Sequence, residues 1–253
     1  MTLKWPKVGL MLGHHDSLQS YRRSALGSFW ISIGMAVQIG VMGVIFGIIF
    51  KSNLSDYVPY LATSVITWGL ISMTVNEGTT SFTSSDALIK QFNLSHTEHV
   101  ARTVWRNLVL TAHNLVILPM VFLVFWRFPS WQMVAFVPGL LLLVINLIWV
   151  VWLLGMLNAR FRDIQPIVAS SMTIAFYVTP VMWYPKLIDN NSLSHLILGL
   201  NPLYHWLQID RLPILGQWPT WENWGLALAS AGIGWIVTLL AYKKYRNMIA
   251  YWV

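Results

Sequence analysis

The chain has 253 residues, of which 56% are hydrophobic and only 10% are charged, and its mean hydropathy is +0.59. Because soluble domains carry about 25% charged residues, this composition excludes a soluble globular protein and predicts an integral membrane protein. The net charge of +7 forms no basic stripe with interleaved aromatic residues, and cysteine is absent, so neither nucleic acid nor a thiolate-bound metal is an expected partner.

Residues 1–23 mix apolar and basic side chains and lack the short apolar core and cleavage site of a secretory signal peptide. This mixture predicts an amphipathic helix that follows Pro6 and lies in the cytoplasmic interface of the membrane. Arg22 and Arg23 end the segment, and residues 24–50 carry no charge. A run of that length exceeds the roughly 20 residues that cross a bilayer core, so it predicts a first membrane span.

Seven uncharged intervals occur along the chain, and six of them are apolar enough to span a membrane. The other interval, residues 190–209, carries many amide, hydroxyl and imidazole side chains that are unfavourable against lipid, so it is predicted to be re-entrant or interfacial. The sequence therefore predicts an all-α integral membrane protein with a single membrane domain over residues 24–253. The six expected spans are residues 25–50, 58–79, 104–126, 132–157, 164–183 and 223–242.

The basic residues test this arrangement independently. With six spans and a cytoplasmic N-terminus, twelve Lys and Arg residues fall in inner segments and four, Arg211 among them, in outer segments. This imbalance obeys the positive-inside rule and predicts that both termini are cytoplasmic. A seventh span would place Lys243, Lys244 and Arg246 outside, against the same rule.

The long outer segment, residues 184–222, contains four prolines and several tryptophans. Structureless loops of this length are uncommon and usually functional. The segment is therefore predicted to hold short broken helices that dip into the outer leaflet between spans five and six and form a periplasmic gate.

The inner loop, residues 81–102, begins with residues that favour a helix start, Ser84, Ser85 and Asp86. In the helix that follows, Leu88, Ile89 and Phe92 share one face, and Lys90 is turned away from it. Such a helix predicts a coupling element that docks into a groove of a soluble partner. The alternative is a helix that lies flat on lipid headgroups.

Sites for chemistry are few. No Gly-x-x-x-x-Gly-Lys-Ser/Thr loop occurs, so any ATP and Mg are expected on a separate polypeptide. The run His96-Thr97-Glu98-His99 lacks the His-Glu-x-x-His spacing of a zinc protease and is interpreted as a solvated loop. Glu77 is placed at the cytoplasmic end of the second span, within reach of water or Arg102; the alternative is a functional acid inside the membrane.

Several short motifs in fixed order resemble a known family from about residue 10 to the C-terminus. They are Tyr21-Arg22-Arg23-Ser24-Ala25-Leu26-Gly27, Leu88-Ile89-Lys90, Ala159-Arg160-Phe161-Arg162-Asp163-Ile164, Thr179-Pro180-Val181, Leu200-Asn201-Pro202-Leu203 with Arg211, and Tyr251-Trp252-Val253. Together they resemble the permease subunits of polysaccharide-export ABC transporters, which move O-antigen, capsule or teichoic acid across the bacterial inner membrane. The proline often found early in the first span of this family is replaced here by Ser32-Ile33-Gly34.

The resemblance implies a homodimer of this chain joined to two ATP-binding subunits, which would carry ATP and Mg and would grip the helix around Asp86 to Asn93. It implies a polyprenyl-diphosphate-linked polysaccharide as the substrate, most simply O-antigen. Arg22, Arg23, Arg160 and Arg162 would attract the diphosphate at the inner side. Their alternative role is topology alone and, for Arg162, a local pair with Asp163.

A glycan channel favours aromatic walls, because sugars present apolar faces that slide along rings without a deep binding well. The candidates are Phe46, Phe50, Trp68, Phe176, Tyr177, Trp183 and Tyr184, each with core packing or lipid contact as the alternative. No catalytic residue is expected. The competing functions are a related ABC permease for capsule, teichoic acid or another lipid, and a membrane enzyme for lipid-linked sugars. An enzyme would need residues such as Asp189, His195, His205 and Asp210 to converge.

Overall fold

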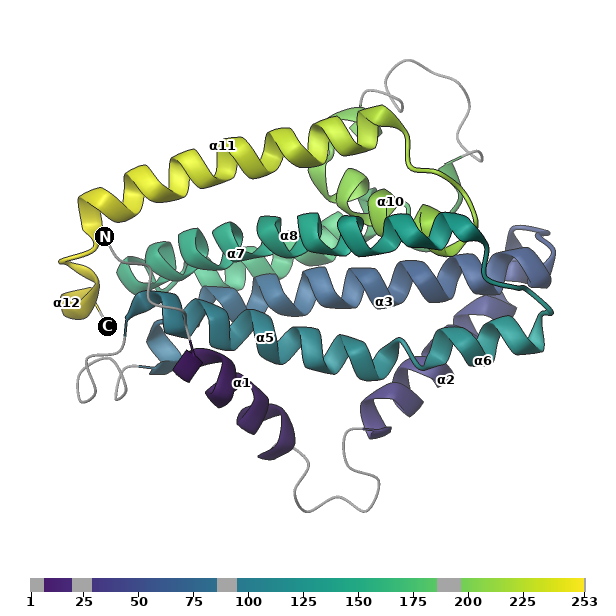
Figure 1. The fold of residues 1–253 in the computed structure, drawn as a ribbon, viewed down its shortest axis with the longest axis horizontal. Helices are drawn as coiled ribbons and strands as arrows, with labels where there is room; N and C mark the ends of the chain where they lie inside the picture. Colours follow the sequence, from purple (N-terminus) through teal and green to yellow (C-terminus); the bar gives the residue numbers. More distant parts are fainter. Residues whose placement is uncertain (1–6, 20–28, 86–94, 186–196, 253) are drawn as a thin grey trace.

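The computed structural model describes residues 7–19, 29–85, 95–185 and 197–252, and this part of the chain is helical, with no strand (Figure 1). The elements in chain order are α1 (Lys7–Gln19), α2 (Phe29–Ile49), α3 (Leu54–Thr79), the 3-10 turn η1 (Thr83–Ser85), α5 (His96–Asn114), α6 (Ile117–Val124), the 3-10 turn η2 (Trp131–Ala135), α7 (Phe136–Arg160), α8 (Ile164–Val178), α10 (Pro202–Ile214), α11 (Trp221–Tyr245) and α12 (Ile249–Trp252).

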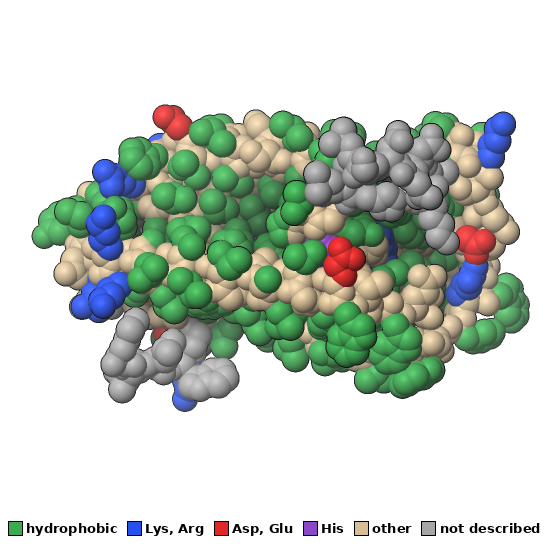
Figure 2. Space-filling model, turned by 90° about the horizontal axis from the view of Figure 1, so that it is seen from above, with side chains coloured by type: hydrophobic (Ala, Val, Ile, Leu, Met, Phe, Trp, Pro, Cys, Tyr) green, Lys and Arg blue, Asp and Glu red, His purple; other side chains and the backbone are tan. Residues whose placement is uncertain are grey.

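Five helical stretches within the described residues are long and apolar enough to cross a membrane. They are Phe29–Ile49, Leu54–Thr79, His96–Val124, Trp131–Arg160 and Trp221–Tyr245. The all-helical, multi-span prediction is thus confirmed in its coarse form. On the face seen in Figure 2, Lys and Arg side chains gather mostly at the two ends of the molecule and hydrophobic ones cover much of its length, as expected for a protein whose middle lies in lipid.

Helix α8 is the shorter apolar helix that the six-span arrangement would require as its fifth span. It ends at Val178, before the predicted residue 183, because Thr179 precedes Pro180 and adopts an extended conformation with φ −81° and ψ 133°. Its 15 residues extend about 22 Å at 1.5 Å per residue, less than a bilayer core of about 30 Å. The chain beyond Val178 packs on α3 instead of continuing the helix.

The central element is α3, which packs against α2, α5, α6, α7, α8 and α10. In the most apolar 18-residue stretch of α3, 83% of the residues are buried, whereas in the corresponding stretches of α2 and α11 only 22% are buried. Hydroxyl groups on this buried helix find acceptors on its own backbone: Thr63 Oγ1 donates to the Tyr60 carbonyl at 2.9 Å and Ser64 Oγ to the same carbonyl at 2.7 Å. Such local bonds let a helix with many Ser and Thr residues lie in an apolar core.

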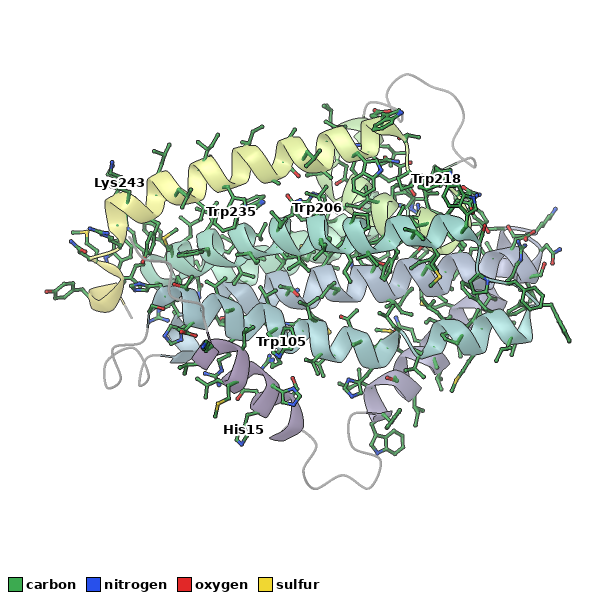
Figure 3. All side chains as sticks on the ribbon, viewed as in Figure 1. His15, Trp105, Trp206, Trp218, Trp235 and Lys243 are labelled. Atoms are coloured by element: carbon green, nitrogen blue, oxygen red, sulfur yellow. The ribbon has the colours of Figure 1, made fainter. Side chains whose placement is uncertain are left out.

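Helix α11 is tied to α7 by a buried polar cluster. The Asn146 amide donates to the Ala227 carbonyl at 3.1 Å, and its oxygen accepts from Trp149 Nε1 at 3.1 Å and from Ser230 Oγ at 2.9 Å. Trp206 of α10 donates from Nε1 to Ser230 Oγ at 2.9 Å and so joins the cluster (Figure 3). Because every group in this set is satisfied, the three helices share one defined packing.

Helix α1 packs on the first half of α5, and it does so through small residues. A Cβ atom at Gly9 would lie 2.2 Å from the Glu98 carbonyl oxygen, and one at Gly13 would lie 2.6 Å from that of Arg102. Asp16 adds an ion pair to Arg102 at 2.6 Å. The apolar side chains of Val8 and Met11 are exposed, so this packing depends on close backbone approach at the glycines and on the ion pair.

Candidate functional site

The short helix α10 lies toward the end of the bundle opposite α12 and organises the candidate site (Figure 1). Asn201 caps it: its side-chain oxygen accepts from the Leu203 backbone N–H at 3.0 Å, and Pro202 takes the first helical position. The Asn201 amide also donates to Thr179 Oγ1 at 2.9 Å. The residues that begin α10 therefore also bind it to the segment that follows α8.

Arg211 of α10 is only 1% exposed and lies among uncharged oxygen atoms. Its guanidinium donates to Ser64 Oγ at 3.0 Å, to the Pro180 carbonyl at 2.7 Å and to Gln208 Oε1 at 2.9 Å. It also lies over the ring of Tyr60, 4.3 Å from the centroid. A buried cation is tolerated only when acceptors and a π face replace water, and here these groups come from α3, α10 and the segment after α8.

Two tyrosines of α3 hold the same segment. Tyr57 Oη donates to the Met182 carbonyl at 2.5 Å. Tyr60 Oη lies 2.9 Å from the Pro180 carbonyl and 2.8 Å from the Trp183 carbonyl, and with one proton it donates to one of them at a time. Residues 179–184, which lead into the predicted periplasmic gate at residue 184, are thus fixed on one side by α3 and on the other by α10.

Three of the predicted channel aromatics meet in one cluster around Tyr57. Phe46 stacks on Phe50 with ring centroids 5.7 Å apart, and Phe50 meets Tyr57 edge-on at 6.1 Å. Tyr184 lies 5.7 Å from Tyr57 and 4.3 Å from Tyr60. These ring pairs link the C-terminal end of α2 to Arg211, since Arg211 lies over the Tyr60 ring.

The other four aromatics form a second group on and near α8. Trp68 is buried beneath Phe176, with ring centroids 5.8 Å apart, and Phe176 meets Tyr177 at 5.5 Å. Trp183 donates from Nε1 to the Tyr177 carbonyl at 3.1 Å. Trp68 supports this group from within the core, whereas Tyr177 is 62% exposed.

Helix α8 has three distinct faces. Met172 and its neighbours pack against the core, and Ile167 and Ile174 form an exposed apolar face. Between these two faces runs a third, exposed and mostly polar, which holds Gln165, Pro166, Ala169, Ser170, Thr173 and Tyr177. At 100° per residue these positions fall within one sector of the helix. A polar sector on an otherwise apolar helix is unsuited to lipid.

At the other end of the molecule, Arg160 and Arg162 contact the C-terminal helix. The Arg160 guanidinium lies 5.4 Å from the ring centroid of Trp252 and 5.0 Å from that of Phe161. Arg162 donates to the Trp252 carbonyl at 3.4 Å. Both side chains are exposed. The other residues predicted for this end, Arg22, Arg23, Asp86, Leu88, Ile89, Lys90 and Phe92, lie outside the described residues.

One interpretation of this end was wrong and another was wrong in part. Glu77 lies in the last turn of α3, as predicted for the end of the second span, but its basic partner is Arg106, with which it forms an ion pair. The Asn107 amide also donates to Glu77 at 2.6 Å, and Arg102 pairs with Asp16 instead. The run from His96 to His99 is the first turn of α5 and no solvated loop, with His99 only 2% exposed against Phe82. Within the described residues, no three His, Cys, Asp or Glu side chains are grouped to hold a metal.

Arg211 and Asp210 are the buried residues that sequence reasoning missed. Arg211 was counted among the charges of the outer segments, because an isolated arginine between uncharged residues gives no sign of which helices will cover it. Asp210 is 1% exposed, and its Oδ1 has no hydrogen-bond partner among the described residues. His205, on the same helix, is engaged by Asn223 and by the Gly199 carbonyl. The other two enzyme candidates, Asp189 and His195, lie outside the described residues.

Comparison with known proteins agrees with this helical architecture. Residues 12–211 match the model of the ABC-2 type transporter family. The chain belongs to the ABC-2 type transporter family. Two relatives are both named O-antigen export system permease protein RfbA: one from Myxococcus xanthus, 24% identical over 72% of this chain and 70% of the relative, and one from Klebsiella pneumoniae, 20% identical over 77% of this chain and 79% of the relative.

This membership confirms the resemblance to the permease subunits of polysaccharide-export ABC transporters. ABC-2 permeases are non-catalytic membrane subunits of transporters, and ATP is bound by partner subunits. As a multi-pass permease of this family, the protein belongs in the inner membrane.

Proposed function

We propose that this permease forms a homodimer that exports a lipid-linked polysaccharide, with O-antigen the favoured cargo, from the cytoplasm to the periplasm. In this proposal α8 is the fifth of six spans and both termini are cytoplasmic. The names of both relatives refer to O-antigen export, which supports this substrate class for the present chain. Capsule, teichoic acid and other lipid cargo are the alternatives within the family.

The observation that carries the proposal is the polar sector of α8. In the single chain Gln165, Thr173 and Tyr177 face outward, where lipid would meet polar groups. Pairing two copies across α8 would remove this sector from lipid and line a path with hydroxyl, amide and aromatic groups. Such a lining offers hydrogen bonds to sugar hydroxyls and ring faces to sugar C–H groups.

The gate then lies where α8 ends. Residues 179–184 are held by Tyr57, Tyr60 and Arg211, so movement of α8 relative to α3 would be transmitted to Trp183 and Tyr184. We propose that the ATP-binding subunits drive this movement through the loop around Asp86 to Phe92 and through α1. The basic residues Arg22, Arg23, Arg160 and Arg162 would receive the polyprenyl diphosphate at the inner side.

The proposal is tested by blocking the polar sector without disturbing the lipid face. Ser170→Trp inserts a large ring into the sector, and Ile174→Trp inserts the same ring on the exposed apolar face of the same helix. In the native host deleted for its chromosomal copy, Ser170→Trp is expected to abolish surface polysaccharide while the ATP-binding subunit still co-purifies. Ile174→Trp is expected to retain export. Equal export by both variants would refute the proposed path.

A further inference from the structure

An apolar groove runs along the outside of the bundle because α6 leaves the line of α5. The break lies at Leu115 and Val116, and Pro119 explains it: a proline has no N–H for the carbonyl four residues earlier, that of Leu115, and its ring clashes with that carbonyl. Helix α6 packs on α3, and between it and η2 with the start of α7 lies an open cavity of about 530 Å³.

The cavity is lined almost entirely by apolar side chains. Leu118, Phe122 and Leu123 of α6 form one wall and Met133 and Phe136 the other, with Ile214 of α10 between them. A second cavity of about 270 Å³ shares Leu115 and Phe136 with the first and continues inward to Asp210. The larger volume lies within the roughly 300–1,000 Å³ of ligand pockets, and its apolar lining suits a hydrocarbon chain.

The outer mouth of the groove carries a cation at the depth of the membrane interface. Trp126, Phe128 and Trp131 surround the mouth and are 70% or more exposed, and Trp131 meets Trp218 with ring centroids 4.9 Å apart. Such aromatic belts mark the headgroup level of a bilayer. Arg127 lines the cavity there, and half of its side chain remains exposed.

The position of Arg127 is built into the end of α6. Trp126 adopts φ 53°, and the Arg127 N–H closes the helix on the Phe122 carbonyl at 2.9 Å, as in a Schellman motif. A left-handed conformation at a non-glycine residue is unfavourable and persists only where the surroundings require it. Asp56 pairs with one Nη atom of Arg127, which orients the guanidinium and leaves its other donors to a further anion.

We propose that this groove is a binding site for an anionic phospholipid of the outer leaflet, with one acyl chain in the cavity between α6 and η2 and the phosphate on Arg127. The apolar lining selects an acyl chain, and Arg127 at the mouth of the cavity selects a negatively charged headgroup over a zwitterionic one. None of the residues that line the cavity belongs to α8.

The test measures lipid retention by the full-length protein in detergent with native mass spectrometry. The protein is delipidated and then offered dioleoyl phosphatidylglycerol or dioleoyl phosphatidylcholine. The wild type is expected to retain phosphatidylglycerol preferentially. Arg127→Gln is expected to lower this preference about fivefold, the factor that corresponds to roughly 1 kcal/mol for one basic residue near an anionic membrane surface.

Asp56→Asn separates lipid binding from the ion pair. It breaks the same pair as Arg127→Gln but leaves the cation, so the preference for phosphatidylglycerol is expected to persist. Loss of the preference in both variants would show that only the ion pair matters and would overturn the proposal. Met133→Trp fills the cavity and is expected to abolish retention of both lipids by the protein. Val134→Trp changes an exposed neighbour outside the cavity lining, and lipid retention is expected to stay at the wild-type level.

A second measurement uses the wild-type protein and so does not depend on any variant folding. Phosphatidylglycerol with a photoreactive group on one acyl chain is expected to label peptides from α6 and η2 above those from α11. Even labelling of all lipid-facing helices would overturn the proposal. Displacement of phosphatidylglycerol by a lower concentration of undecaprenyl diphosphate would assign the groove to the substrate lipid and would equally overturn it.

Discussion

Arg211→Lys is the sharpest test of the buried contacts that Arg211 of α10 makes with Tyr60 and its hydrogen-bond acceptors. Lysine keeps the positive charge, but a single ammonium group cannot reach Ser64, Pro180 and Gln208 together and cannot lie flat over Tyr60. Loss of two of the three hydrogen bonds to a charged group, each contributing about 1.5–3 kcal/mol, costs at least about 3 kcal/mol. Burial of the more strongly hydrated ammonium gives no compensation. The expected net destabilisation is about 3 kcal/mol.

For chains of 150–250 residues, 1 kcal/mol shifts the midpoint of thermal unfolding by about 2–4 °C, so Arg211→Lys should lower it by roughly 6–12 °C. The assay is tryptophan fluorescence in one detergent at one scan rate, because membrane proteins often unfold irreversibly. The matched control is Arg127→Lys, the same chemical change at a half-exposed residue whose ion pair with Asp56 contributes at most about 1 kcal/mol.

Two results would refute the reasoning. One is an Arg211→Lys midpoint within about 2 °C of the wild type, which would mean that the guanidinium contacts contribute little. The other is strict additivity of Ser64→Ala and Arg211→Lys, because residues that share a hydrogen bond are expected to show a coupling energy of at least about 0.5 kcal/mol.

Three further substitutions test the packing elsewhere. Gly9→Ala places a Cβ atom against the Glu98 carbonyl, so it should lower the unfolding midpoint and loosen the packing of α1 on α5, which faster cleavage of α1 by protease would detect. Gly232→Ala, where a Cβ atom meets nothing within 4 Å, should have neither effect. Asn146→Leu leaves Trp149 Nε1 without its acceptor and removes the bond to Ala227, so a loss of about 2 kcal/mol is expected by the same thermal assay, and an unchanged midpoint would contradict the role of this cluster. Glu77→Gln leaves the half-buried Arg106 without its charge partner and should destabilise by about 1 kcal/mol, with a smaller effect in 1 M salt; a larger effect in salt would contradict the ion pair.

The membrane class, the existence of long apolar helices and the family were predictable from the sequence, because each depends on local composition. A helix in lipid must satisfy its own backbone, so an uncharged apolar run of sufficient length is sufficient evidence for it. Motifs such as Asn201-Pro202 also act locally: the asparagine caps α10 and the proline begins it. The resemblance in turn rests on short segments that can be compared without knowing where they lie.

Contacts between distant segments were not predictable in this way. Glu77 meets Arg106 and not Arg102 because α1 takes Arg102 through Asp16, and that competition exists only once α1 lies on α5. His99 is buried because α5 begins earlier than its apolar residues suggest, under cover of Phe82. Charge and hydropathy along the chain contain no information on either contact.

The sequence by itself determined that this protein lies in a membrane as a bundle of apolar helices, because burial in lipid is decided segment by segment. Only the tertiary structure decided where its polar groups act. It placed Arg211 inside the bundle, turned one polar sector of α8 outward, and opened a groove beside Pro119 with Arg127 at its mouth. These features depend on which helices meet and at what angle, and that geometry follows from the packing of side chains far apart in the chain.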